Sequence, residues 1–307
     1  MNQSQRNPSR RLFVAAIASA GASLSLQIPA LAAEASRKPL NLVVLTDTHL
    51  GYKSSDAAEQ LWKQTAAEVT TIDADLILHL GDLVDQGQEP LYPRYLEHRR
   101  QIKAPVHEIP GNHDPQELFE KYIRKPIDTV VDHEWLRLLL LNNSRTDSHD
   151  GFLKTEQLTW IESQLADAAK RDLLTIVCMH VPAHANKHPD RGWHVKPEHG
   201  QRELYAKLAR HSSRVLALFH GHFHNGLRGW DGPVPAGEEA RPVHEICFPS
   251  ALYNQDRKLM EQKAPGYNLS EFRPSYCVVT LGQGKMQVQL RVVGQGDAAS
   301  KELPVGT

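Results

Sequence analysis

Cysteine is scarce in this sequence: its 307 residues include only Cys178, Cys247 and Cys277. Each lies in an apolar, strand-like run, where a cysteine normally behaves as a small buried hydrophobic residue. None is placed among other metal-ligating side chains, which argues against a structural zinc site or an iron–sulfur cluster built on thiolates. One disulfide with one thiol left over is the alternative, and the sequence does not choose the pair.

Net charge is nearly absent as well. The formal net charge is −1 and the isoelectric point is about 7.0, so no global basic field draws the chain to nucleic acid or to an anionic membrane. Internal repeats, low-complexity tracts and an interdomain linker are also lacking. With 40% apolar content the chain can bury a full core, and the missing linker favours one large domain over two small ones.

A long unbroken apolar run is missing near the N-terminus. The twin arginine Arg10-Arg11 precedes an apolar stretch that Ser, Gly, Gln and Pro interrupt, so this stretch is too polar to span a bilayer comfortably. Ala30-Leu31-Ala32 then offers a small-residue cleavage site. We expect a signal peptide over residues 1–33, export by the twin-arginine machinery, and a periplasmic or secreted protein without a stable membrane anchor after cleavage near Ala32.

Strand-like and helical patterns alternate in the first half of the chain. Such alternation predicts βαβ units and a largely parallel sheet, and the strand-rich later part predicts a second sheet packed against the first. We expect an α/β domain over residues 38–293 and a loose tail at 294–307. Strands are expected at about 40–46, 76–80, 105–109, 173–179, 214–219, 243–248, 276–281 and 285–293, and two more between 129 and 141 around the turn Asp132-His133-Glu134. Helices are expected at about 57–70, 91–101, 155–170 and 201–211.

Polar side chains follow the ends of five of these strands. Any one of them alone is ordinary turn chemistry. Ligands bind at the carboxyl ends of strands in α/β sheets, so we expect side chains at these ends to converge, and their oxygen and nitrogen atoms predict a metal site. The residues are Asp47, His49, Asp82, Asn112, His113, His180, His222 and His224.

This donor set suffices for two divalent or mixed-valence metal ions. Two Asp, one Asn and four His complete two centres if one carboxylate bridges them and His113 stays free. Two ions roughly 3.5–4 Å apart would hold a hydroxide ready for in-line attack on phosphorus. An uncoordinated histidine could then donate a proton to the leaving oxygen.

Five motifs together resemble the calcineurin-like metallophosphoesterase superfamily over residues 47–225. They are Asp47-x-His49, Gly81-Asp82-x-x-Asp85, Gly111-Asn112-His113-Asp114, the lone His180 and Gly221-His222-x-His224. The resemblance implies a four-layer αββα fold, in which a two-sheet β-sandwich is flanked by helices, and metals that are usually iron, manganese or zinc.

The resemblance also implies a role for each motif residue. Asp47, His49 and His224 would hold the first metal, Asn112, His180 and His222 the second, and Asp82 would bridge the two. His113 would lie beside the scissile phosphate as proton donor, with Asp114 orienting its ring.

Three positions distinguish branches of the superfamily. Asp85 stands where purple acid phosphatases carry tyrosine, and Asp114 where the nucleotidase branch carries glutamate. The Gly-Asn-His-Asp motif is closer to the cyclic-nucleotide phosphodiesterase-like branch. That branch tends to have a second histidine where Val181 stands, so the chain departs from it there.

Five further histidines have less specific surroundings. His184, His188 and His194 follow His180 in a loop that either lines a substrate entrance or is a solvated surface. His79 and His220 lie among apolar neighbours, and we expect them to pack or to support the ligands rather than to bind metal.

The sequence therefore predicts a dinuclear metal-dependent phosphoester hydrolase that acts on a small molecule, with a phosphodiester favoured over a monoester. The alternatives are a periplasmic phosphomonoesterase or nucleotidase, and a non-catalytic metal-binding protein on the same fold. The near-neutral charge gives no support to a nucleic-acid partner. The motifs leave the natural substrate, the native metal and the oligomeric state open.

Overall fold

The computed structural model describes residues 37–54, 56–185, 192–227, 233–234, 243–254 and 272–305. The expected signal peptide and His188 lie outside these residues. Within them, no helix is both long enough and apolar enough to cross a membrane.

The first of two six-stranded sheets has the order β12-β11-β10-β1-β2-β3. Its strands β1, β2 and β3 run parallel, and β10, β11 and β12 extend it by antiparallel pairing on the other side of β1. The strands are β1 (Leu40–Leu45), β2 (Leu76–His79), β3 (Val106–Glu108), β10 (Ser275–Gly282), β11 (Lys285–Val292) and β12 (Gly296–Pro304).

The second sheet has the order β4-β5-β6-β7-β9-β8. Here β5, β6, β7 and β9 are parallel, and the edge strands β4 and β8 pair antiparallel. The strands are β4 (Thr129–His133), β5 (Leu136–Leu140), β6 (Leu174–Cys178), β7 (Val215–His220), β8 (Pro233–Val234) and β9 (Val243–Cys247).

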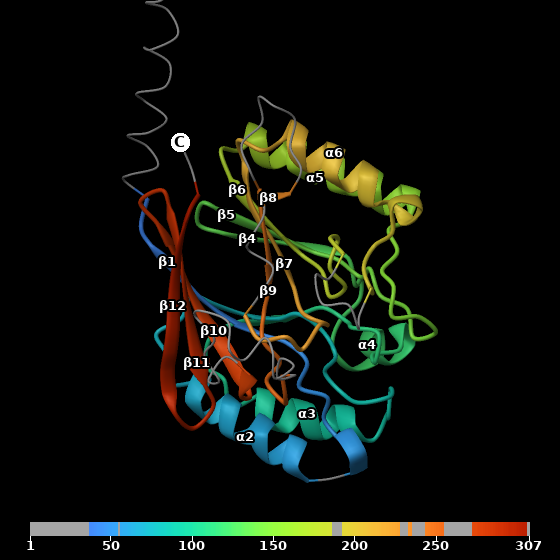
Figure 1. Ribbon diagram of the computed structural model, residues 1–307, viewed down its shortest axis with the longest axis vertical. Coiled ribbons are helices and arrows are strands. Elements are labelled where there is room, and N and C mark those ends of the chain that lie inside the picture. Colours follow the sequence, from blue (N-terminus) through green and yellow to red (C-terminus); the bar gives the residue numbers. More distant parts are fainter. Residues whose placement is uncertain are drawn as a thin grey trace, which may run out of the picture.

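Helices cover the outer faces of both sheets, which confirms the expected αββα order (Figure 1). On β1, Leu42 and Val44 face the core between the sheets, while Val43 and Leu45 face the helices. This period of two is what a strand buried on both faces requires. Helices α2 (Ala57–Val69) and α3 (Leu91–Arg99) cover the first sheet, and α5 (Thr155–Lys170) and α6 (Gln201–Arg210) the second.

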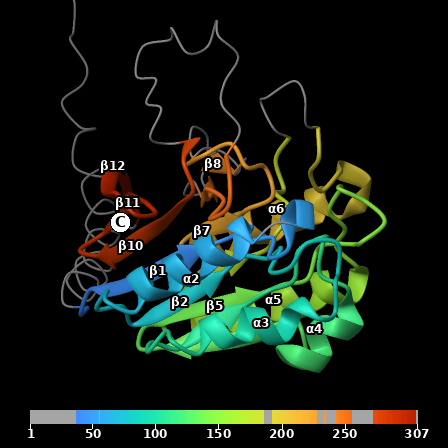
Figure 2. The same ribbon diagram turned by 90° about the horizontal axis from the view of Figure 1, so that it is seen from below.

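Shorter helices lie in the connections. Helix α4 (Gln116–Tyr122) follows β3, and the 3₁₀ turns η1 (Tyr52–Ser54) and η2 (Pro197–His199) follow β1 and precede α6. Figure 2 shows α2, α3 and α4 on the side of the molecule that faces the viewer. These connections carry the polar residues that leave the strand ends.

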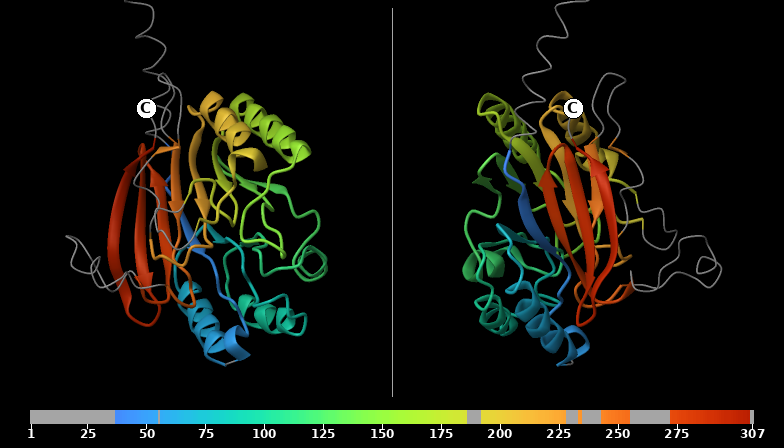
Figure 3. Two further views of the ribbon diagram at one scale, coloured as in Figure 1. Left: turned by 45° about the vertical axis from the view of Figure 1, so that its right-hand side comes forward. Right: turned by 90° about the vertical axis from the view of Figure 1, so that its left-hand side faces the viewer.

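The expected loose tail is wrong for most of its length. Residues 296–304 form β12, which pairs with β11 so that Leu303 lies opposite Met286 and is buried. Figure 3 shows β10, β11 and β12 as one long antiparallel block at the edge of the molecule. The tail lacks a strand signature because residues 296–304 include no β-branched or aromatic side chain, and the backbone pairing with β11 holds it. The domain therefore extends beyond the expected limit at residue 293.

The three cysteines are free and buried. This agrees with their reading as small hydrophobic residues in apolar strands, and no disulfide joins any pair of them. Burial also raises the pKa of each thiol, so none is activated as a nucleophile.

Candidate metal centre

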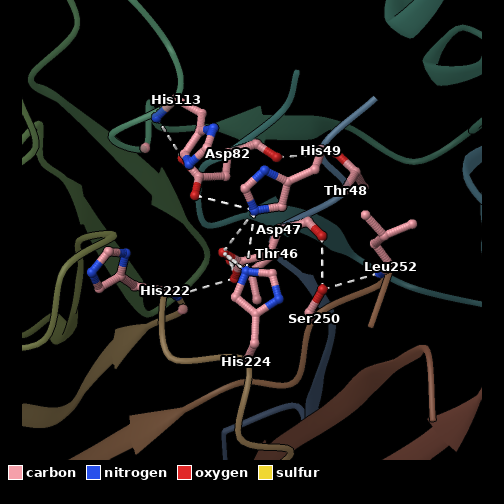
Figure 4. A network of polar contacts seen from close by, with 12 residues as sticks. Thr46, Asp47, Thr48, His49, Asp82, His113, His222, His224, Ser250 and Leu252 are labelled. Carbon is pink, nitrogen blue, oxygen red and sulfur yellow. Dashed lines mark hydrogen bonds and ion pairs between the residues drawn. The ribbon is translucent and has the colours of Figure 1, made fainter. Parts of the chain in front are cut away.

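The eight residues expected at strand ends come together at one rim, where the parallel strands of both sheets end. Backbone hydrogen bonds join the outgoing segments, such as Asp47 N–H to the Gly81 carbonyl and Gly221 N–H to the His180 carbonyl. Figure 4 shows side chains from these segments pointing toward one another. Except for the half-buried His113, all are buried: Asp47, His49, Asp82, Asn112, His180, His222 and His224.

One group of ligand atoms consists of Asp47, His49 and His224. Oδ1 of Asp47 lies 3.1 Å from Nε2 of His224 and 3.7 Å from Nε2 of His49. The two Nε2 atoms are 3.1 Å apart. Atoms bound tetrahedrally to one ion at 2.0–2.1 Å lie about 3.3 Å from each other, so the three atoms have the spacing of a metal site.

A second group consists of Asp82, His180 and His222, with Asn112 beside it. Oδ2 of Asp82 lies 3.1 Å from Nε2 of His180 and 3.4 Å from Nε2 of His49. One carboxylate oxygen therefore faces an imidazole of each group. The other oxygen of Asp82 accepts a hydrogen bond from the His113 amide at 2.8 Å, which fixes the carboxylate.

Several buried polar atoms in these groups make no hydrogen bond. They are Oδ1 of Asp47, Oδ1 of Asn112, and Nε2 of His180 and His222. A buried polar atom without a partner costs about 1–3 kcal/mol. Cations held by these atoms would satisfy all four, so the residues fit metal ions.

Hydrogen bonds occupy one polar atom of each of these side chains and leave the other atom available to an ion at the centre. Nδ1 of His180 lies 2.7 Å from the Leu80 carbonyl, and Nδ1 of His224 lies 2.9 Å from the Tyr253 carbonyl. A proton on Nδ1 directed at a carbonyl leaves the Nε2 lone pair for a metal. Oδ2 of Asp47 is likewise occupied by the Thr46 hydroxyl at 2.6 Å, so Oδ1 remains for the centre.

Charge in the metal-free site is balanced by protons. Burial would lower the pKa of His49, but the facing carboxylates of Asp82 and Asp47 raise it to about 10. Burial would also lower the pKa of His180, but the negative charge of Asp82 raises it to about 9. Burial would raise the pKa values of Asp47 and Asp82, but the imidazoles lower both. The buried carboxylates thus stay ionised and demand positive charge, which metal ions would supply.

The backbone of the ligand residues is strained. Asp47, His49, Asp82, His222 and His224 have φ angles of 55°, 40°, 54°, 73° and 50°. Each left-handed residue that is not glycine costs of order 1–3 kcal/mol, and such residues gather at functional sites. The adjacent glycines are needed for space, because a Cβ atom at Gly111 would collide with the Asp82 carboxylate.

His113 is held by Asp85, and the expectation that Asp114 orients its ring is wrong. Nδ1 of His113 lies 3.1 Å from Oδ1 of Asp85 and accepts a hydrogen bond from the Gln86 amide at 3.2 Å. Asp114 is buried beneath the loops and accepts hydrogen bonds from the Leu83 and Gly111 amides and from the Tyr92 hydroxyl.

The turn geometry explains why Asp85, and not Asp114, contacts the His113 ring. The short chain between Asp82 and Asp85 brings the second carboxylate up to the rim, whereas Asp114 points back to tie its own loop to the turn after β2. Burial, followed by the negative charge of Asp82, raises the pKa of Asp114 to about 6. Asp114 therefore supports the loops that carry the ligands.

Two aromatic pairs lie beside the centre, and no motif in the sequence marked them. The rings of His149 and Trp193 stack at 4.1 Å, and each lies within 6 Å of the His222 ring, at 5.9 and 5.5 Å. Tyr52 and Tyr253 stack at 5.2 Å on the side of His224. The sequence could not predict these two pairs, because the two residues of each pair lie far apart in the chain.

His149 also contacts a ligand. Its Nδ1 lies 3.4 Å from Nδ2 of Asn112, which directs the amide nitrogen outward and leaves Oδ1 of Asn112 toward the centre. His79 supports the other side, as expected: its ring packs edge-on against Trp62 and Tyr95, and its Nε2 lies 3.2 Å from the Thr48 hydroxyl. Burial lowers the pKa of His79 to about 3, so it is neutral.

Comparison with known proteins points in one direction. The family model for calcineurin-like phosphoesterases matches residues 40–226. The chain is 25% identical over 249 residues to a 3',5'-cyclic-nucleotide phosphodiesterase of a Nostoc species, which covers 75% of this chain and 87% of that protein. It is 30% identical over 209 residues to the 3',5'-cyclic adenosine monophosphate phosphodiesterase of Escherichia coli K12, covering 63% and 73%.

Among solved structures, the purple acid phosphatase PPD1 from yellow lupin seeds superposes with a TM-score of 0.67. The match covers 89% of this chain and 55% of that one at 13% identity. At this identity the likeness shows the fold alone.

Proposed function

This chain belongs to the calcineurin-like phosphoesterase family and is a metal-dependent phosphoester hydrolase; on that premise we propose that it uses two metal ions to hydrolyse a phosphodiester, with a cyclic nucleotide as the substrate class. The observation that carries the proposal is the position of one Asp82 oxygen between Nε2 of His49 and Nε2 of His180, at 3.4 and 3.1 Å.

The metal assignment follows the two groups of ligand atoms. Asp47, His49 and His224 would hold one ion, and His180, His222 and Asn112 the other, with Asp82 shared. Two ions bound there would neutralise phosphate oxygens and supply a hydroxide nucleophile near neutral pH. Iron, manganese and zinc all suit this mixture of imidazole and oxygen donors.

His113 would provide the proton for the leaving alkoxide. Among the histidines of the eight strand-end residues, His113 is half-buried and the others are buried. Its side chain is 26% exposed. Asp85 and the Gln86 amide hold the ring at Nδ1, which leaves Nε2 to face a bound phosphoester. A positioned acid of this kind contributes roughly 10²–10⁴-fold to the rate.

The stacked pair of His149 and Trp193 supports a substrate with a flat substituent. An exposed imidazole on a half-exposed indole, 4.1 Å apart, offers a surface on which a nucleobase can stack. The cyclic-nucleotide phosphodiesterases among the relatives support the same class. Val181 stands where a second histidine is common in that branch.

A phosphoester panel tests the proposal. The protein is loaded with Mn²⁺, Zn²⁺ or Fe²⁺ and assayed on 3',5'-cyclic nucleotides, a bis-aryl phosphate and a mono-aryl phosphate. We expect the diesters to be hydrolysed faster than the monoester, and Trp193→Ala to weaken cyclic-nucleotide turnover more than that of a dialkyl phosphodiester.

The other results are equally informative. Faster monoester hydrolysis would establish the phosphomonoesterase or nucleotidase alternative. Loaded protein with no activity on any ester would establish a non-catalytic metal-binding protein on this fold.

We also propose export by the twin-arginine machinery, which rests on Arg10-Arg11, the interrupted apolar stretch and Ala30-Leu31-Ala32. Fractionation of cells that express the full chain tests it. Replacing both arginines by lysine should leave uncleaved protein in the cytoplasm, and unchanged export of that variant would rule the route out.

A further inference from the structure

A second cluster of metal-ligating side chains lies outside the site described above. It consists of His184 in the loop after β6, His220 at the end of β7, and Glu245 in β9. One ligand atom from each residue lies within 4.8 Å of the other two. The cluster shares no side chain with the ligands of the proposed catalytic ions.

His220 has a buried nitrogen with no partner. Its side chain is fully buried, and Nδ1 lies 3.2 Å from the Gly221 carbonyl, to which a proton on Nδ1 would be directed. Nε2 then carries a lone pair and makes no hydrogen bond. This lone pair faces Oε1 of Glu245 at 3.9 Å, so two electron-rich atoms confront each other in the protein interior.

His184 repeats this arrangement from the other side. Its Nδ1 is also buried without a hydrogen-bond partner and lies 3.5 Å from the same Glu245 oxygen. Neither imidazole is close enough to the carboxylate for a hydrogen bond of normal length. A cation between the three atoms would give both nitrogens a partner.

We propose that His184, His220 and Glu245 form a third metal site that binds a divalent cation of the zinc type. Two imidazoles and one carboxylate are a known zinc ligand set, with a water molecule as the fourth ligand. The separations of 3.5 and 3.9 Å exceed the about 3.3 Å between tetrahedral ligands by about 0.2 and 0.6 Å. The His184 side chain is 26% exposed, which provides a route for the ion and the water.

The surroundings of Glu245 are those of a ligating carboxylate. Tyr205 donates its hydroxyl to Oε2 at 3.0 Å, and the amides of Ala183 and His184 donate to Oε1 at 2.7 and 3.0 Å. Such outer hydrogen bonds orient metal ligands. They also show the competing explanation, in which Glu245 only anchors the loop after β6; that explanation leaves the two imidazole nitrogens unpaired.

The site would join β9 to two segments that carry proposed catalytic ligands. The loop of His184 begins at His180, and His220 lies two residues before His222 on the same strand end. A cation here would therefore hold two ligand-bearing segments to β9. Its expected role is to stabilise the rim, independently of catalysis.

Metal stoichiometry tests the proposal. The full protein is stripped with a chelator, reloaded with Zn²⁺, freed of excess metal by gel filtration and measured by mass spectrometry. We use His184→Ala, whose side chain is partly exposed, and Glu245→Gln, which can still accept the two amide hydrogen bonds. His244→Ala is the matched control, because His244 neighbours Glu245 on β9 but its Nε2 contacts the Pro304 carbonyl at 2.8 Å.

We expect about three zinc ions in the wild type and in His244→Ala, and about two in His184→Ala and Glu245→Gln. The melting temperature of those two variants should gain less from added Zn²⁺ than that of the wild type. A wild type with no more than two ions, or variants with as much zinc as the control, would overturn the proposal. Asp82→Asn separates this result from the dinuclear proposal, because it should lose catalytic metal and keep the third ion.

Discussion

Nδ1 of His113 lies 3.1 Å from Oδ1 of Asp85, and the same oxygen lies 3.4 Å from Nδ1 of His49. The carboxylate that ends the Gly81-Asp82-x-x-Asp85 motif therefore links the proposed proton donor to a ligand of the first metal. Burial would raise the pKa of Asp85, but the imidazoles of His113 and His49 beside it lower it, so Asp85 is ionised at neutral pH.

Replacing Asp85 by asparagine should slow the reaction without removing metal. The amide keeps the shape but loses the charge that orients the His113 ring, and loss of such an outer contact costs about 10–100-fold. The decrease in kcat should be larger for a diester with a poor leaving group than for an aryl ester. Equal rates of the variant and the wild type on the poor leaving group would show that the contact has no role in catalysis.

Removing the proton donor itself should have a larger effect. We expect His113→Ala to keep its metals and to lose roughly 10²–10⁴-fold in kcat on substrates with poor leaving groups. Metal analysis of the same preparation is the control. Loss of metal from His113→Ala, or a full rate on a poor leaving group, would contradict the role assigned to His113.

Asp114 should matter for folding rather than for proton transfer. Its carboxylate accepts hydrogen bonds from the Leu83 and Gly111 amides and from the Tyr92 hydroxyl, and an asparagine can accept only part of this set. We expect Asp114→Asn to lower the free energy of unfolding of the metal-free protein by about 1–3 kcal/mol. Urea titration measures the loss. Asp85→Asn removes only the contact with the half-exposed His113 ring, so it should lower the free energy of unfolding less than Asp114→Asn does.

The shared position of Asp82 predicts unequal effects of ligand loss. Asp82→Asn should weaken both catalytic ions, because the same oxygen faces His49 and His180, whereas His224→Ala should chiefly weaken one. Metal content measured over a titration of Mn²⁺ distinguishes the two variants. If Asp82→Asn lost one ion and kept the other at full occupancy, Asp82 would not be a bridge.

Glu162 gives a pH-dependent contribution that is independent of the metals. It joins α5 to the end of α6 through Arg210 at 2.6 Å and His211 at 2.9 Å. Burial would raise its pKa, but these partners lower it to about 2. A carboxyl with a lowered native pKa stabilises the fold above its unfolded pKa near 4.5, and this stabilisation is lost as the pH falls toward 2.

The test compares Glu162→Gln with the wild type by urea unfolding between pH 7 and pH 3. The difference in unfolding free energy should stay constant above about pH 5, remain under about 1 kcal/mol because the side chain is one-third exposed, and shrink at lower pH. Glu203→Gln, at an exposed position of α6, is the control. A difference that grew on acidification would have the wrong sign for this ion pair.

Much of the fold could be predicted because its signals are local. The nearly continuous apolar run of β1 and the amphipathic pattern of α5 are written in consecutive residues, and α5 spans the expected residues 155–170. Strand β12 could not be predicted, since it contains no β-branched or aromatic residue and is held by pairing with β11.

The convergence of the proposed ligands was also predictable, because the carboxyl ends of parallel strands meet at one rim and each motif lies at such an end. Contacts between loops were not. Whether Asp85 or Asp114 reaches His113 depends on how two turns pack, and both residues carry the same chemistry. The stacking of His149 on Trp193 and the cluster around Glu245 likewise join distant segments and have no local pattern.

The left-handed backbone at Asp47, His49, Asp82, His222 and His224 has a consequence for how this chain tolerates change. Glycine adopts that conformation without strain. Replacing one of these residues by glycine would therefore relieve backbone strain and remove the side chain that the proposed activity needs. Selection for thermal stability alone would therefore favour glycine at these positions. The proposed requirement for bound ions would keep the side chains there. The residues that we propose as metal ligands are those at which a more stable protein would be an inactive one.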